Sequence, residues 1–165
     1  MYPKVHNFPG KGRGIVATQL FRRGEFVVEY SGDLIDMAEA REREKLYAAD
    51  QNTGCYMYYF QHKNQSYWYV INILLNATFV LYANLRLILF FNSYSVDATS
   101  ESHRLGRLVN HSRQSGNLMP KVIEIKDRPH LLLVARSDIL PGEELLYDYG
   151  DRSRVSLKYH PWLAS

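Results

Sequence analysis

Cysteine is almost absent from this chain of 165 residues, because Cys55 is the only one. A single thiol excludes a disulfide framework within the chain and a zinc cluster built from several cysteines. The chain also has little net charge, because 20 lysines and arginines against 17 acidic residues leave only +3. This small excess does not indicate non-specific DNA binding. We also expect no secretory signal peptide.

The length and composition are those of a single globular domain. Hydrophobic residues make up 46% of the chain and charged residues 22%, which is ordinary for a protein with one buried core. The first ten residues, with two prolines and a glycine, are predicted to be a loop. Strands are predicted at residues 15–18, 26–30, 56–60, 122–125 and 130–136, the last two forming a hairpin.

One helix is expected, from Asp36 to Ala49. The Asp36 side chain can accept hydrogen bonds from the free N–H groups of the first turn, and Glu39 stands where a capping box has its carboxylate. Leu46 and Tyr47 are expected to pack inward. Many short strands and one helix predict a mainly β domain.

Residues 69 to 95 are an almost uncharged apolar run, rich in leucine, isoleucine, phenylalanine, tyrosine and asparagine. The run approaches the roughly 20 apolar residues of a membrane helix. Asn72, Asn76, Asn84 and Arg86 interrupt it, however, and an arginine near the bilayer centre costs about 2.5–3.5 kcal/mol. Three interpretations stay open: a nonfunctional insert such as a translated intron, a buried or self-associating loop, and a membrane contact.

Three polar motifs carry the functional information. Lys11-Gly12-Arg13-Gly14 lies near the start, and Asn110-His111-Ser112 follows the apolar stretch 105–109. A core buries such an Asn-His pair only with hydrogen-bond partners. Residues 142–151 hold two tyrosines, Tyr147 and Tyr149, in an apolar and strand-like run. Positions i and i+2 of a strand share a face, so both phenols are expected to point into one cavity.

Together these motifs resemble those of the SET-domain protein lysine methyltransferases. In that family they meet around S-adenosylmethionine and the target lysine. Residues 53–60, 104–112 and 159–163 are similar to the branch of the family that monomethylates lysine 20 of histone H4. The resemblance implies one SET domain over residues 1–165, with the mainly β, β-clip fold, a pseudoknot, short helices and an apolar insertion at about 69–95.

The resemblance also implies a cofactor site for S-adenosylmethionine and no metal. Glycines let the backbone approach a ligand, and cations can meet the cofactor's carboxylate. From the residues alone, the first motif is equally a basic surface turn, the histidine a structural one, and the aromatic residues parts of a core. The residues expected to bind the cofactor are Lys11, Gly12, Arg13, Tyr56, Asn110, His111 and Trp162.

Three tyrosines are expected to carry the reaction. By resemblance, Tyr149 orients the amine and the methyl sulfonium, and Tyr30 forms a wall of the lysine channel. A hydroxyl on Tyr147 can hold a water in the space that a second methyl group would need. Arg107 and Asp151 also match the family and are predicted to be structural.

The sequence therefore predicts a transferase that monomethylates the histone H4 tail in nucleosomes, in the nucleus and on the chromosome, as a chromatin regulator. Other lysine-bearing proteins are further candidate substrates, and no sequence-specific nucleic acid partner is expected. The alternative is a chromatin-binding module with the same fold but impaired catalysis, or a mispredicted gene product. The insertion motivates that alternative, because it falls between Tyr56 and Asn110.

Overall fold

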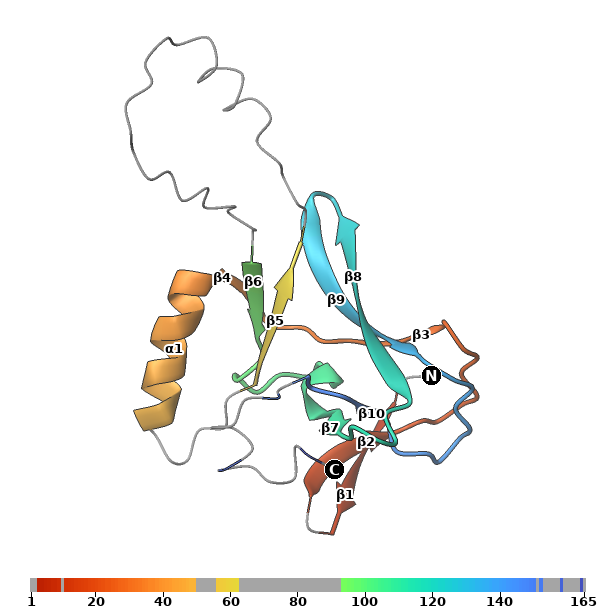
Figure 1. The fold of residues 1–165 in the computed structure, drawn as a ribbon. Coiled ribbons are helices and arrows are strands. Elements are labelled where there is room, and N and C mark those ends of the chain that lie inside the picture. Colours follow the sequence, from red (N-terminus) through yellow and green to blue (C-terminus); the bar gives the residue numbers. More distant parts are fainter. Residues whose placement is uncertain are drawn as a thin grey trace, which may run out of the picture.

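The computed structural model describes residues 3–9, 11–49, 56–62 and 93–150, together with residues 152, 158 and 164. In this part of the chain, short strands surround a small core and one α-helix lies to the side (Figure 1). The predicted mainly β fold is thus confirmed. Two sheets have two strands each: β1(Lys4–Phe8) with β2(Gly12–Val16), and β10(Leu146–Tyr147) with β7(Asn110–His111). Two sheets have three strands each, in the orders β3(Phe26–Glu29)–β9(Arg128–Ala135)–β8(Leu118–Ile125) and β4(Asp33–Asp36)–β6(Ser93–Asp97)–β5(Met57–Gln61). The helices are α1(Met37–Ala49) and the short 3₁₀ helix η1(Gly106–Leu108).

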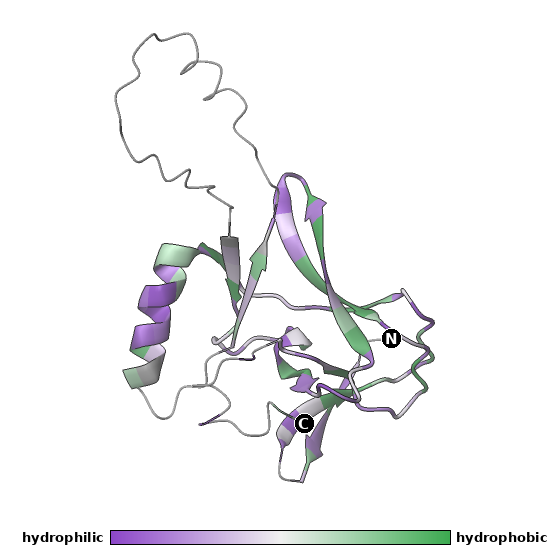
Figure 2. Cartoon of the chain, in the orientation of Figure 1, coloured by the Kyte–Doolittle hydropathy of each residue, from purple (hydrophilic) through white to green (hydrophobic). Residues whose placement is uncertain are grey.

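The central strand of the largest core is β9. It pairs with β8 from Leu118↔Ala135 to Ile125↔Arg128 and with β3 on its other edge. Its second half is apolar at every position, as expected for a strand that is covered on both faces. Leu131 and Leu133 are 1% and 0% exposed, and Figure 2 shows the hydrophobic colouring of β9 toward its end near β3. The predicted hairpin is therefore present, and longer than the sequence pattern indicated.

The two residues that join β8 to β9 are held in a left-handed conformation. Lys126 and Asp127 have φ of 51° and 59°, values that suit glycine and that other residues adopt at a cost of about 1 kcal/mol. Tight hairpin turns of this hand favour glycine at the second position. Asp127→Gly is expected to raise the free energy of unfolding by about 1 kcal/mol and Tm by about 2–4 °C. Thermal denaturation checks this, and an unchanged or lower Tm would contradict it.

Helix α1 begins as the sequence predicted, since Asp36 Oδ1 accepts the N–H groups of Ala38 and Glu39, each at 2.9 Å. Glu39 does not complete a capping box but accepts hydrogen bonds from Arg43, one turn later. The prediction that Leu46 packs inward is wrong, because its side chain is 70% exposed. The helix instead turns the face of Ala40, Arg43 and Tyr47 toward the sheet, so a polar cluster rather than an apolar stripe docks it.

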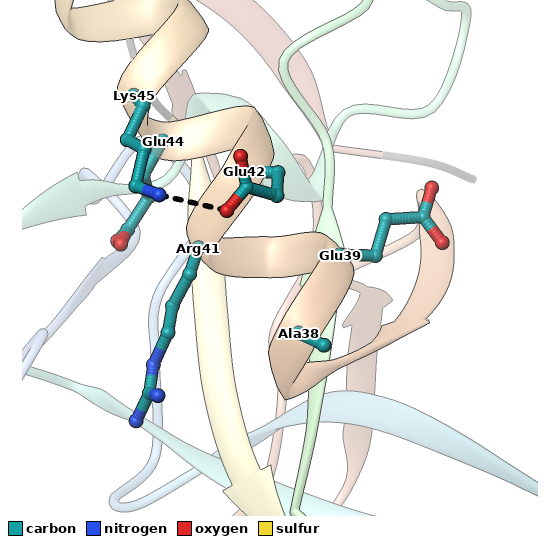
Figure 3. A pocket seen from close by; sticks show the side chains of 6 residues that line it. All are labelled: Ala38, Glu39, Arg41, Glu42, Glu44 and Lys45. Carbon is teal, nitrogen blue, oxygen red and sulfur yellow. Dashed lines mark hydrogen bonds and ion pairs between the residues drawn. The ribbon is translucent and has the colours of Figure 1, made fainter.

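The opposite face of α1 is solvated and charged. Figure 3 shows a surface hollow along the helix, with an ion pair of 2.7 Å between Lys45 and Glu42. All six residues that line the hollow are exposed, so it has no buried polar group that would hold a ligand. It is lined by Ala38, Glu39, Arg41, Glu42, Glu44 and Lys45.

Strands β5 and β6 form an antiparallel pair in unbroken register, from Met57↔Asp97 to Gln61↔Ser93. Of the predicted insertion, residues 93–95 belong to β6, and residues 69–92 lie outside the described residues. The pairing places the two ends of the intervening segment side by side at one end of the strand pair. Tyr56 lies at the other end, about 16 Å away at the usual rise of a strand. The segment therefore leaves from the end that is far from Tyr56.

Two predictions near the N-terminus were wrong. The first ten residues were expected to be a loop, but Lys4–Phe8 is the strand β1, paired with β2 from Lys4↔Val16 to Phe8↔Gly12. Its first four residues are exposed, so no alternation of apolar residues marks it in the sequence. The next strand, predicted at residues 15–18, is Gly12–Val16, because the glycine-rich motif itself is extended and pairs with β1.

Within the described ranges, no helix is long and apolar enough to cross a membrane.

Candidate active site

Four tyrosines from different segments lie in one connected cluster. The rings of Tyr30, just after β3, and Tyr58 of β5 are 6.0 Å apart between centroids. The Tyr58 ring is 6.2 Å from that of Tyr147, which in turn is 4.7 Å from that of Tyr149. The three tyrosines singled out in the sequence are therefore brought together. Tyr58 was not among the predicted site residues, and no sequence signal marked it as the link between Tyr30 and Tyr147.

Tyr149 is held at the edge of this cluster by two hydrogen bonds. Its hydroxyl donates to the carbonyl oxygen of Val109 at 2.8 Å, and its backbone N–H donates to Nδ1 of His111 at 3.1 Å. The side chain remains 36% exposed, whereas Tyr147 is only 3% exposed. Tyr147 thus closes the cluster on the protein side, and Tyr149 forms its partly exposed edge.

The strand argument for the two tyrosines was wrong in one respect. Strand β10 ends at Tyr147, so Tyr149 lies beyond it and alternation along a strand does not place its ring. The parallel pairing of β10 with β7 (Leu146↔Asn110, Tyr147↔His111) supplies the placement instead. It sets His111 beside the end of β10, where its ring meets that of Tyr149 at 5.0 Å.

His111 is 8% exposed, and its hydrogen bond to Tyr149 determines which ring nitrogen carries the proton. Because Nδ1 accepts the N–H of Tyr149, the neutral ring carries its proton on Nε2. The ring therefore orients Tyr149. Among the described residues, no group of three or more histidine, cysteine, aspartate and glutamate side chains could hold a metal ion.

A carboxylate joins the first two sequence motifs. Glu144 accepts a hydrogen bond from Lys11 Nζ at 2.9 Å on one oxygen and from Asn110 Nδ2 at 2.9 Å on the other. Asn110 crosses close over Gly14, where a Cβ atom would lie 2.5 Å from Nδ2, so only glycine admits this approach. Glu144 was not among the predicted site residues. Two carboxylates in a row before an apolar strand were the only sequence signal for it.

A second carboxylate joins Arg13 to the surroundings of Tyr56. Glu101 pairs with Arg13 at 2.6 Å and with Arg107 at 2.8 Å. These two guanidinium groups, Arg13 first, lower the pKa of Glu101 to about 2. Arg107 is buried and lies over the Tyr56 ring, 4.1 Å from its centroid. It also donates to the carbonyl oxygens of residues 98 and 99, in line with its predicted structural role.

Tyr147 and Tyr149 are held in the neutral form. Burial raises the pKa of Tyr147 well above its ordinary value, and the neighbouring phenols of Tyr30, Tyr149 and Tyr58 add to the effect. Burial is also the main cause of the raised pKa of Tyr149, followed by Tyr56. Groups in this state donate hydrogen bonds and do not act as bases at neutral pH.

Of the remaining predicted site residues, the structure describes Gly12 but not Trp162. Gly12 has φ of 79°, and the space that a side chain would fill there is open within 4 Å. Trp162 and Asp151 lie outside the described residues.

Comparison with known families agrees with this geometry. The SET domain pattern matches residues 12–150, so the chain belongs to the SET-domain family. Among individual proteins, the chain is 55% identical over 161 residues to the histone-lysine N-methyltransferase Set8 of Drosophila melanogaster. It is 51% identical over 160 residues to the N-lysine methyltransferase KMT5A of Xenopus tropicalis.

These alignments cover 98% and 97% of this chain, but it spans only 19% of the length of the fly protein and 39% of the frog protein. Among solved structures, CpSET8 from Cryptosporidium is similar with a TM-score of 0.70 and 37% identity, over 92% of this chain and 58% of that one.

Proposed function

We propose that this chain is the catalytic domain of a protein-lysine N-methyltransferase that adds one methyl group to lysine 20 of histone H4 in nucleosomes. Its methyl donor is S-adenosylmethionine, and its place is the nucleus, on chromatin. The observation that carries the proposal is the tyrosine cluster beside the Lys11–Glu144–Asn110 bridge, in a chain so similar to Set8.

The described residues fit a zwitterionic nucleoside ligand beside β2 and β7. Lys11 and Arg13 supply cations for a carboxylate, and the backbone at Gly12 faces open space into which a ligand can come close. Glu144 and Asn110 offer further polar atoms next to Lys11. When bound, S-adenosylmethionine supplies an electrophilic methyl group on its sulfonium. Trp162 is proposed to close over the adenine ring.

The tyrosines act by orientation and by excluding water. A lysine amine with a pKa near 10.4 is almost wholly protonated at pH 7, so the site must favour the neutral amine by desolvation. The buried Tyr30 and Tyr147, joined by the partly buried Tyr58, supply that desolvation. Since Tyr147 and Tyr149 have raised pKa values, neither serves as a general base, and the amine loses its proton to solvent. Catalysis then rests on alignment and fixed dipoles.

The alternative, a SET-fold module without turnover, was motivated by the apolar segment between Tyr56 and Asn110. The unbroken register of β5 and β6 speaks against it, because both strands keep their pairing with this segment between them. Tyr56 also stays tied to the strand pair, through the N–H of Ala98 that donates to its carbonyl oxygen at 2.9 Å.

The direct test is methyl transfer from labelled S-adenosylmethionine to recombinant nucleosomes, with mass spectrometry of histone H4. The full chain is compared with a variant that lacks residues 69–92, which spares β6. We expect one methyl on lysine 20 from both. Activity in the shortened variant alone would mean that the segment inhibits the enzyme. No transfer by either, with both folded, would favour the binding module.

Tyr147→Phe tests how the number of methyl groups is limited. The change removes one hydroxyl from a side chain that is 3% exposed and frees the room of a water molecule beside the amine. We expect the product to shift from monomethyl to dimethyl lysine, with the rate of the first transfer changed by less than about 10-fold. Intact-mass spectrometry of histone H4 over time checks this. A variant that still stops at one methyl would contradict the proposed role of the Tyr147 hydroxyl.

The raised pKa values of the tyrosines predict the pH dependence. Because the raised pKa values keep the phenols of Tyr147 and Tyr149 protonated at neutral and mildly alkaline pH, we expect the substrate lysine to govern the rate in this range. The rate with a histone H4 peptide at low concentration should therefore rise about tenfold per pH unit from about pH 7 to pH 9. Initial rates across this range check it, and a falling limb below about pH 9.5 would indicate an ionising tyrosine.

A further inference from the structure

Asp97, at the end of β6, is a buried carboxylate outside both the tyrosine cluster and the Lys11–Glu144–Asn110 bridge. It is 5% exposed and accepts three hydrogen bonds. Oδ2 accepts from Arg43 at 2.8 Å and from the Tyr47 hydroxyl at 2.7 Å, both on α1. Oδ1 accepts the backbone N–H of Thr99 at 3.0 Å. Burial alone would raise the pKa of Asp97, but these donors, Arg43 first, hold it below its usual value, so the group is ionised.

The residues that follow Asp97 hold the two groups that flank the proposed cofactor site. The Thr99 hydroxyl oxygen accepts the backbone N–H of Tyr56 at 3.2 Å, and Ala98 N–H donates to the carbonyl oxygen of Tyr56 at 2.9 Å. Arg107 donates to the carbonyl oxygens of Ala98 and Thr99, at 2.6 and 3.1 Å. The Tyr56 ring and the Arg107 guanidinium, stacked at 4.1 Å, are thus both fixed to this short segment.

The same segment also borders the tyrosine cluster. Ala98 is 3% exposed and packs in one apolar cluster with Tyr30. The carbonyl of Asp97 lies so close to Gly32 that any side chain there would collide with it. A change in the conformation of residues 97–99 would therefore reach both Tyr56 and Tyr30.

We propose that Asp97 is a positioning residue, which transmits the docking of α1 to Tyr56 and Arg107 and thereby sets the affinity for S-adenosylmethionine. The inference rests on the proposed function. The ionised carboxylate matters because both of its oxygens accept. An asparagine offers one acceptor oxygen and one NH₂ group, so it must leave either the donors on α1 or the N–H of Thr99 without an acceptor.

Four variants separate positioning from a merely structural role. Asp97→Asn removes one of the two acceptor oxygens that join α1 to Thr99. Thr99→Val removes only the oxygen that holds Tyr56 N–H, whereas Thr99→Ser keeps it. Asp33→Asn is the matched control, since Asp33 also pairs with Arg43 at 2.9 Å but is 70% exposed. Calorimetric titration gives the Kd for S-adenosylmethionine, steady-state rates separate KM from kcat, and the NMR shift of the Tyr56 amide reports its hydrogen bond.

We expect Asp97→Asn and Thr99→Val to raise the Kd and KM for S-adenosylmethionine about tenfold, with kcat at saturation changed less than about threefold. Thr99→Val should also shift the Tyr56 amide signal, while Thr99→Ser and Asp33→Asn bind the donor as the original chain does. If Asp97→Asn does not fold, the Thr99 pair decides.

The inference is overturned if Thr99→Val binds S-adenosylmethionine as tightly as Thr99→Ser does. Asp97 would then only anchor the helix. If the unaltered chain binds no S-adenosylmethionine, the proposed function itself fails and this inference falls with it. The two failures are therefore distinct.

Discussion

Tyr149→Phe is expected to lower kcat for methyl transfer by at least about 100-fold, the usual cost of removing one fixed dipole from a reacting centre. The hydroxyl that is lost donates to Val109 at 2.8 Å, so in the intact protein its oxygen is held in one place beside the open face of the cluster. The ring keeps its contact with His111 at 5.0 Å, and the backbone N–H still donates to that histidine. The fold should therefore survive. Single-turnover rates at saturating S-adenosylmethionine measure the effect.

Tyr59→Phe is the matched control for this variant. Tyr59 lies on β5 next to Tyr58, but its side chain is 40% exposed and outside the cluster. Its loss of a hydroxyl should change kcat by less than about twofold. If Tyr149→Phe were equally mild, Tyr149 would not be catalytic. A large rise in KM for S-adenosylmethionine with unchanged kcat would instead assign Tyr149 to binding.

Gly106→Ala is expected to destabilise the fold by about 3 kcal/mol or more, one of the largest effects of any single methyl group in this chain. A Cβ atom at Gly106 would collide with the carbonyl oxygen of Glu29 and lie 2.9 Å from Cα of Tyr30. These neighbours are backbone atoms at the end of β3 and just after it. Backbone atoms cannot move aside as a flexible side chain can. Tm should fall by at least about 6 °C. Because the displaced residue is Tyr30, methyl transfer should fall with it.

Gly24→Ala is the control for the glycine change. Gly24 has φ of 87°, so alanine is strained there, but nothing lies within 4 Å of the new methyl group. The cost should be limited to about 1 kcal/mol of backbone strain, with activity retained. If the two variants lost the same Tm, the close packing of Gly106 in η1 against β3 would not explain the effect of Gly106→Ala.

The sequence predicted the parts of the fold that depend on local chemistry. Asp36 starts α1 because its carboxylate meets free N–H groups two and three residues later, and this pattern is visible in the chain itself. Strand β1 could not be predicted, because it is exposed and exists only through its pairing with β2. Leu46 was misplaced since the helix is docked by Arg43 and Tyr47 on a carboxylate 50 or more residues away.

The candidate site shows the same division. Tyr30, Tyr147 and Tyr149 could be named from motifs that resemble a known family, and the structure gathers them in one cluster. The carboxylates that connect the motifs could not. Glu144 meets Lys11 across 133 residues of sequence, and Glu101 meets Arg13 across 88, and a single sequence carries no signal for such contacts.

The strand pair β5–β6 also marks a place where foreign sequence can be introduced. Gln61 and Ser93 are paired although residues 62–92 separate them. Lengthening a flexible connection roughly eightfold costs only about 2 kcal/mol in closure entropy, because the cost grows with the logarithm of length. A compact reporter domain whose termini lie close together could therefore be spliced in at this point. It would project about 16 Å from Tyr56, and so away from the proposed cofactor site.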